Sequence, residues 1–243
     1  MARLPRYILP GLPHHLIQRG NNRGVIFFAD LDYRFYLECV HLASERHHVA
    51  IHAYVLMTNH AHLVVTPERG QSLSKMMHLI GLRYAQYINL NYQRTGTLWE
   101  GRYKATPIDT EPYLLTCYRY VESNPIRANM VGDPGDYRWS SYAHHALGRC
   151  NPLIRDHDLY LALGKTTEAR CRVYRALFRN SLSIETTNAI RDATNGGWAL
   201  GNDRFREEIE QAAKRRTSRL SRGGQREGAG RHKASRSAGV RSD

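Results

Sequence analysis

The stretch Ile51-His52-Ala53-Tyr54-Val55-Leu56-Met57-Thr58-Asn59-His60-Ala61-His62-Leu63-Val64-Val65 decides the fold of this 243-residue chain. Its two apolar runs read as strands, and the polar pair between them reads as a short turn, so the stretch predicts a β-hairpin. Strand side chains alternate between faces, so His60 and His62 project from the same side of the sheet. Two imidazoles held this way can share one cation, which makes the hairpin a candidate metal site.

The segments around the hairpin predict a regular order of strands and helices. Further strands are expected over residues 14–18 and 102–108, and the first ends in the polar turn 19–24. Helical periodicity and capping residues predict three helices. These helices run from Asp30 or Asp32 to the His47-His48 pair, from Ser72 or Ser74 to Tyr92, and from Glu111 to Asn124, where Pro125 stops the last one. The resulting order is βαββαβ followed by α.

This order indicates an α+β fold, the split βαββαβ plan of ferredoxin-like domains. In that plan the first and third strands are central, the helices pack on one face, and the other face stays open for a ligand. The histidine strand is the third, so we expect its histidines in mid-sheet. We expect this domain to span residues 5–140. Residues 141–212 read as a helical C-terminal extension without chemistry of its own, and residues 213–243 read as a disordered basic tail.

The charge of the chain favours a polyanionic partner. The formal net charge is +13 and the pI is about 9.8, which makes nucleic acid the first expectation. Residues 214–243 hold ten basic side chains against Glu227 and Asp243, so this stretch carries +8 of the total. It serves either to keep the protein soluble or to bind phosphates without sequence preference. No apolar run resembles a membrane span or a signal peptide, so we expect a cytoplasmic protein.

The third predicted helix supplies two side chains to one spot. At 100° per residue, Leu114, Tyr118 and Val121 form one apolar stripe, which we expect to be core. Tyr120 lies at the margin of that stripe, four residues before Asn124, so its hydroxyl and the asparagine amide project together. A tyrosine at the margin of a core can act as a nucleophile.

Two motifs resemble those of one enzyme family. Thr58-Asn59-His60-Ala61-His62-Leu63 resembles the HUH motif, histidine-hydrophobic-histidine. Tyr118-Arg119-Tyr120-Val121-Glu122-Ser123-Asn124-Pro125-Ile126-Arg127-Ala128 resembles the tyrosine helix of the single-tyrosine HUH (IS200-like) transposases. Within that family, residues 14–23 (HHLIQRGNNR) and 98–104 (LWEGRYK) resemble the REP-associated tyrosine transposases, which are linked to repetitive extragenic palindromes. The resemblance covers about residues 5–145.

The resemblance implies a metal-dependent transposase that cleaves and rejoins single-stranded DNA at hairpin sites through a 5′-phosphotyrosine. Tyr120 would be the nucleophile, with His60 and His62 as catalytic residues. His60, His62 and Asn124 would hold Mg²⁺ or Mn²⁺. Two positions depart from relatives: Asn124 stands, as in the REP-associated group, where mobile-element relatives tend to have glutamine, and the small Ala61 stands where bulkier aliphatic residues are also common.

Several polar residues are candidates for contacts with DNA, and each also has an ordinary structural use. Trp99 can either stack on a base or anchor the core. The DNA-binding candidates are Arg19, Asn21, Asn22, Arg23, Arg102, Lys104 and Arg127. The expected partner is a DNA hairpin, a repetitive extragenic palindrome by the resemblance, and a monomer is favoured over a homodimer. The alternative function is a non-catalytic protein that binds single-stranded DNA or RNA hairpins.

Overall fold

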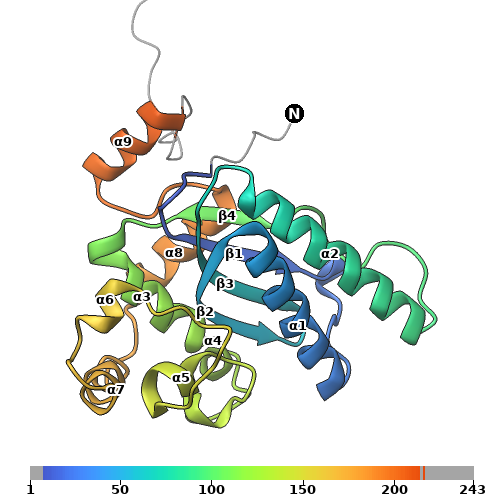
Figure 1. The fold of residues 1–243 in the computed structure, drawn as a ribbon, viewed down its shortest axis with the longest axis horizontal. Coiled ribbons are helices and arrows are strands. Elements are labelled where there is room, and N and C mark those ends of the chain that lie inside the picture. The colour runs from blue at the N-terminus through green and yellow to red at the C-terminus, as the bar shows by residue number, and fades with distance from the viewer. Residues whose placement is uncertain (1–7, 214–215, 217–243) are drawn as a thin grey trace, which may run out of the picture.

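The computed structural model describes residues 8–213 and 216, and its centre is a four-stranded antiparallel sheet (Figure 1). The sheet order is β2-β3-β1-β4, so β1 and β3 are central, as predicted. The strands are β1 (His14–Arg19), β2 (Val49–Met57), β3 (His60–Pro67) and β4 (Lys104–Pro107). Ile17 pairs with His62 and Arg19 with His60 between the two central strands. The predicted ferredoxin-like α+β fold is confirmed.

The two helices that connect the strands pack together on one face of the sheet. α1 (Asp30–His47) and α2 (Ser72–Asn91) lie side by side there (Figure 1). Leu16, Leu63 and Val65 point toward them from the central strands and join one buried core. This arrangement follows from the period of two along a strand, because odd and even positions of β3 serve different faces.

The other face of the sheet is not left open, and this part of the prediction was wrong. α3 (Thr110–Glu122) lays its stripe of Leu114, Tyr118 and Val121 against Val55 and Val64, and all three stripe residues are fully buried. An apolar stripe of this kind must be covered by something, and the sheet face is the nearest apolar surface. The open part of this face is therefore confined to the end where the histidines lie.

The third helix also ends earlier than predicted. α3 stops at Glu122, and α4 (Asn124–Arg127) follows after Ser123. Pro125 lies in the first turn of α4, where its missing N–H costs nothing. Pro125 therefore ends one helix and begins the next.

The segment after residue 141 is helical, as predicted, and forms part of a second buried core, on the α3 side of the sheet. It contains α5 (Tyr142–Leu147), α6 (Asp158–Leu161), α7 (Thr167–Ala176), α8 (Ile184–Gly196) and α9 (Asp203–Ala213). Two short 3₁₀ turns, η1 (Asn21–Arg23) and η2 (Pro134–Asp136), precede this segment. Tyr160, Tyr174 and Ile190 are buried against the α3 side of the sheet. The boundary at residue 141 remains a prediction. The expected basic tail, apart from Ala213 and Arg216, lies outside the described residues.

Within the described part of the chain, no helix is long and apolar enough to cross a membrane.

Candidate functional site

The histidine pair lies together on the α3 face of the central strand β3. The ring centroids of His60 and His62 are 4.9 Å apart. His62 is buried, and His60 is partly buried at the end of the strand. The prediction that both rings project from the same face of the sheet is confirmed.

Burial keeps both imidazoles in the neutral form that binds metals. It lowers the pKa of His60 to about 4, helped by the positive charge of Arg19. Burial also lowers the pKa of His62 well below its usual value, and the nearby His60 adds to this effect. Both rings therefore have a nitrogen lone pair at neutral pH.

A hydrogen bond decides which nitrogen of His60 has that lone pair. Nδ1 of His60 lies 2.6 Å from Oδ1 of Asn59, whose Nδ2 donates to the Arg23 carbonyl at 2.8 Å. Because the Asn59 oxygen can only accept, His60 Nδ1 carries the proton and its Nε2 has the lone pair. Asn59, in the turn of the hairpin, thus fixes the tautomer of His60 that can coordinate a cation through Nε2.

The site contains a third histidine that was not predicted from the sequence. His15 is fully buried on β1, and its Nε2 lies 2.8 Å from Nδ1 of His62. His14, its neighbour, turns away and donates from Nδ1 to the Leu12 carbonyl at 2.7 Å. The two adjacent side chains thus point apart. The pairing of β1 with β3 is the signal that could have placed His15 beside His62.

Tyr120 reaches this group from α3. Its ring centroid lies 5.8 Å from that of His15 and 6.0 Å from that of His62. The Arg127 guanidinium carbon lies 4.1 Å from the centroid of the Tyr120 ring. Burial lowers the pKa of Arg127, whereas the neighbouring Tyr120 raises it. The structure thus brings the predicted nucleophile, the histidine pair and one predicted cation together.

Asn124 also faces the site, although its amide is already engaged. Its Nδ2 donates to the carbonyls of Tyr120 and Val121, and its Oδ1 accepts from Arg127 Nη2 at 2.7 Å. A carbonyl oxygen has two lone pairs, so one remains for a cation. Two neutral imidazoles and one amide oxygen form a donor set that fits a divalent ion.

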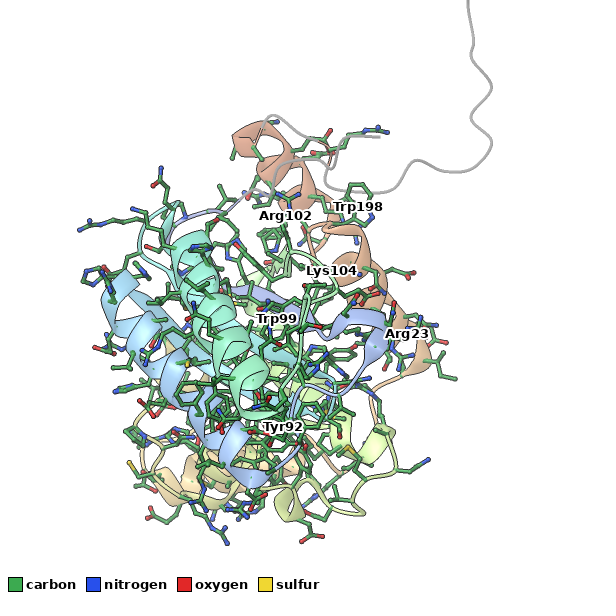
Figure 2. All side chains as sticks on the ribbon, turned by 90° about the vertical axis from the view of Figure 1, so that its right-hand side faces the viewer. Arg23, Tyr92, Trp99, Arg102, Lys104 and Trp198 are labelled. Carbon is green, nitrogen blue, oxygen red and sulfur yellow. The ribbon has the colours of Figure 1, made fainter. Side chains whose placement is uncertain are left out.

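A cavity of about 800 Å³ opens beside these residues and is strongly cationic. Four of the predicted DNA-binding residues line it, together with one arginine of α8 that the sequence analysis missed. These five cations are Arg19, Arg23, Arg102, Lys104 and Arg191, and Glu100 is the one acidic side chain among the residues lining the cavity. Figure 2 shows Arg23, Lys104 and Arg102 along the side of the molecule that also presents Trp198. A wall of this charge suits a phosphate backbone.

Three of the predictions about individual candidates need correction or a structural reading. Asn21 and Asn22 are exposed in η1 and do not line the cavity; Asn22 has a positive φ of 51°, which is a turn role. Arg102 precedes β4 instead of lying on it. Trp99 donates from Nε1 to the Gly81 carbonyl at 3.0 Å and packs against the core, so it acts as an anchor.

A second group of possible metal ligands lies apart from this cavity. His144, His145 and Asp156 have ligand atoms within 4.8 Å of one another. His145 Nδ1 is bound to the buried Glu122 carboxylate at 2.7 Å, and His144 Nε2 to Asp156 at 3.0 Å. None of the predicted ligands belongs to this group.

A ferredoxin-like sheet with a histidine pair next to a tyrosine helix is the arrangement that the resemblance to the single-tyrosine HUH transposases predicted. The family model described as "Transposase IS200 like" matches residues 10–124 of the chain. The family resemblance predicted from the sequence is confirmed.

One solved structure supports the same fold, and a second match is weaker. A REP-associated tyrosine transposase bound to a REP hairpin is 18% identical and aligns with a TM-score of 0.53 over 65% of this chain and 93% of its own. A putative transposase from Deinococcus radiodurans R1 is 16% identical, with a TM-score of 0.35 over 51% of this chain and 97% of its own. No curated protein matches the chain.

Proposed function

We propose that this protein is a metal-dependent DNA strand transferase that cleaves and rejoins single-stranded DNA at hairpin sites. The observation that carries the proposal is the position of Tyr120, whose ring lies 6.0 Å from that of His62 beside a cavity lined by five cations. A tyrosine, a histidine pair and a cationic wall together serve phosphoryl transfer. The match of residues 10–124 to the IS200-like transposase family model supports the same reaction.

The reaction has Tyr120 as nucleophile. Its hydroxyl loses a proton and attacks the scissile phosphorus; an Oη–P bond forms, the P–O3′ bond breaks, and the leaving 3′ oxygen takes up a proton. This leaves a 5′-phosphotyrosine and a free 3′-hydroxyl, and rejoining is the reverse. The Arg127 guanidinium lies 4.1 Å from the Tyr120 ring, where its positive charge can stabilise the negative charge that develops during the attack.

The remaining residues position the phosphate. His60, His62 and Asn124 would hold Mg²⁺ or Mn²⁺, and the ion supplies Lewis-acid stabilisation of the developing charge. Arg19, Arg23, Arg102 and Lys104 bind the strand around the scissile bond. Asn21 and Asn22 are exposed and precede Arg23 of the cavity lining, and they contact the hairpin outside the cavity.

The DNA substrate is a hairpin of the repetitive extragenic palindrome type. The solved relative with 18% identity is bound to such a hairpin, and residues 14–23 and 98–104 carry the resemblance to that subgroup. The site is complete within one chain, since Tyr120 reaches the histidines of its own sheet, and this favours a monomer. We place the protein in the cytoplasm, where chromosomal hairpins are accessible.

The Tyr120→Phe variant tests the nucleophile. Purified protein is incubated with labelled hairpin oligonucleotides and Mg²⁺ or Mn²⁺, and a covalent adduct is sought by denaturing electrophoresis. The wild type gives an adduct and the variant gives none, because phenylalanine lacks the attacking oxygen. Tyr113→Phe, on the same helix but outside the cavity lining, is the matched control and retains the adduct. Adduct formation by Tyr120→Phe would refute the assignment.

The second candidate function is a hairpin-binding protein without catalysis, which the cationic cavity also favours. Tight hairpin binding by the wild type with no adduct on any hairpin tested, with either metal, selects this function.

A further inference from the structure

A chain of buried hydrogen bonds connects helix α8 of the C-terminal extension to His62. Thr194 Oγ1 lies 2.7 Å from the Ile190 carbonyl and 3.0 Å from Nδ1 of His15. His15 Nε2 lies 2.8 Å from Nδ1 of His62. Thr194, His15 and His62 are 4%, 0% and 2% exposed, so water does not compete for these bonds.

The direction of each hydrogen bond follows from the Ile190 carbonyl, the acceptor at one end of this series of hydrogen bonds. The Ile190 carbonyl can only accept, so the single Thr194 hydroxyl proton points to it. Thr194 Oγ1 must then accept from His15 Nδ1–H. A neutral His15 that donates from Nδ1 has its lone pair on Nε2, which in turn accepts from His62 Nδ1–H. Each of the three hydrogen bonds therefore has one assignment of donor and acceptor.

We propose that helix α8 fixes the tautomer of His62 through Thr194 and His15, so that the lone pair of His62 stays on Nε2. His60 reaches the same state independently through Asn59. Both catalytic histidines then offer Nε2 to the cation of the proposed function, on which this part of the inference rests. Thr194 and His15 are positioning residues, because they act through His62.

Hydrogen bonds and burial hold α8, and therefore Thr194, in place. The segment after α8 is bonded to β4: Leu200 N donates to the Pro107 carbonyl at 2.9 Å, and Asp109 N donates to the Leu200 carbonyl at 2.7 Å. Ile190 and Ala193 are buried in the core on the α3 side. The C-terminal extension, for which the sequence predicted no chemistry, is thus part of the site.

Imidazole ¹⁵N spectra of the metal-free, full-length protein test the tautomers directly. Long-range ¹⁵N–¹H correlations distinguish protonated from unprotonated ring nitrogens, and single His15→Gln and His62→Gln variants assign the signals. In the wild type we expect Nδ1–H with an unprotonated Nε2 for both His15 and His62. A protonated Nε2 on His62 would overturn the proposal. This measurement needs neither metal nor cleavage, so inactivity of the wild type would refute the proposed function and leave the relay intact.

Variants of Thr194 test the function of the relay. Thr194→Val keeps the shape but removes the acceptor, so we expect a mixture of His62 tautomers and roughly 10-fold weaker Mn²⁺ binding by calorimetry, the lower end of the effect of losing a partner of a metal-bound histidine. Thr194→Ser keeps the hydroxyl and should bind Mn²⁺ like the wild type. Thr187→Val, at a second buried threonine of α8, is the matched control for packing. Wild-type Mn²⁺ affinity and tautomers in a folded Thr194→Val protein would overturn the proposal; should this variant not fold, the wild-type spectrum decides.

Discussion

At the scale of single residues, buried polar side chains with complete hydrogen bonding hold the fold. Asp32 is fully buried near the start of α1, and its carboxylate accepts from the backbone N–H groups of Phe28 and Ala29 at 2.7 and 2.9 Å. The hydroxyls of Tyr87 and Tyr92 donate to the same carboxylate. Ala29, at the N-cap position, has no side chain able to accept from the first turn, and Asp32, at the N3 position, instead holds the helix start by accepting from the Ala29 backbone N–H.

Asp32→Ala should therefore destabilise the protein strongly. We expect the free energy of unfolding to fall by about 3 kcal/mol, because four donors lose a charged acceptor in a buried place. Urea unfolding followed by circular dichroism measures this loss. Asp30→Ala is the matched control at the same helix start: its ion pair with Arg138 is exposed, so the loss should stay below about 1 kcal/mol. Equal losses in the two variants would contradict this account of α1.

At the scale of elements, α8 gives the cavity its far wall. Arg191, Asn195 and Gly196 line the cavity together with Lys104 of β4, and Lys104 Nζ donates to Asn195 Oδ1 at 2.9 Å. Residues 191 and 104 are far apart in the sequence and meet only because α8 packs beside β1 and β4. The cationic surface is thus shared between the family domain and the extension.

Arg191→Ala should weaken hairpin binding without changing sequence preference. An arginine that contacts phosphate contributes to affinity by releasing counterions, so the slope of log K against log salt should become shallower by roughly one. Fluorescence anisotropy with a labelled hairpin over a series of salt concentrations measures the slope. Arg204→Ala, an exposed arginine of α9 paired with Glu208, serves as the control and should leave the slope unchanged. An unchanged slope in Arg191→Ala would exclude α8 from the DNA surface.

At the scale of the whole molecule, folding buries several histidines in neutral form. Burial lowers the pKa of both His14 and His52 to about 4, although each ring also has a hydrogen bond to a backbone carbonyl. The unfolded chain keeps the usual pKa near 6.5, so between pH 6.5 and 4 it binds more protons than the folded protein. The contribution to stability is present above pH 6.5 and is lost as the pH falls toward 4.

The free energy of unfolding should accordingly decrease as the pH is lowered from 6.5 to 4. His52 lies away from the cavity, with Nδ1 on the Arg155 carbonyl and Nε2 on Thr66 Oγ1, so His52→Gln isolates one group. We expect this variant to be less stable at pH 7 but to lose less stability on acidification than the wild type. Urea titrations at a series of pH values measure both slopes. Parallel slopes would show that His52 does not contribute to acid unfolding.

The sequence by itself determined the sheet, its strand order and the histidine pair. Period-two patterns and the Thr58-Asn59 turn are local, and the order βαββαβ leaves few topologies. The same local reasoning placed Tyr120 and Asn124 toward one spot, although Asn124 lies at the start of α4 and not on α3. These features depend on residues close in sequence, so pattern and spacing were enough to predict them.

Only the tertiary structure decided which distant residues complete the site. His15 meets His62 through the pairing of two strands, and Thr194 meets His15 across 179 positions of the chain. Such contacts follow from the way buried faces pack, which no local period encodes. For the same reason the sequence did not reveal that α3 and α8 cover the second face of the sheet. The histidines lie at the end of this face that the two helices leave uncovered.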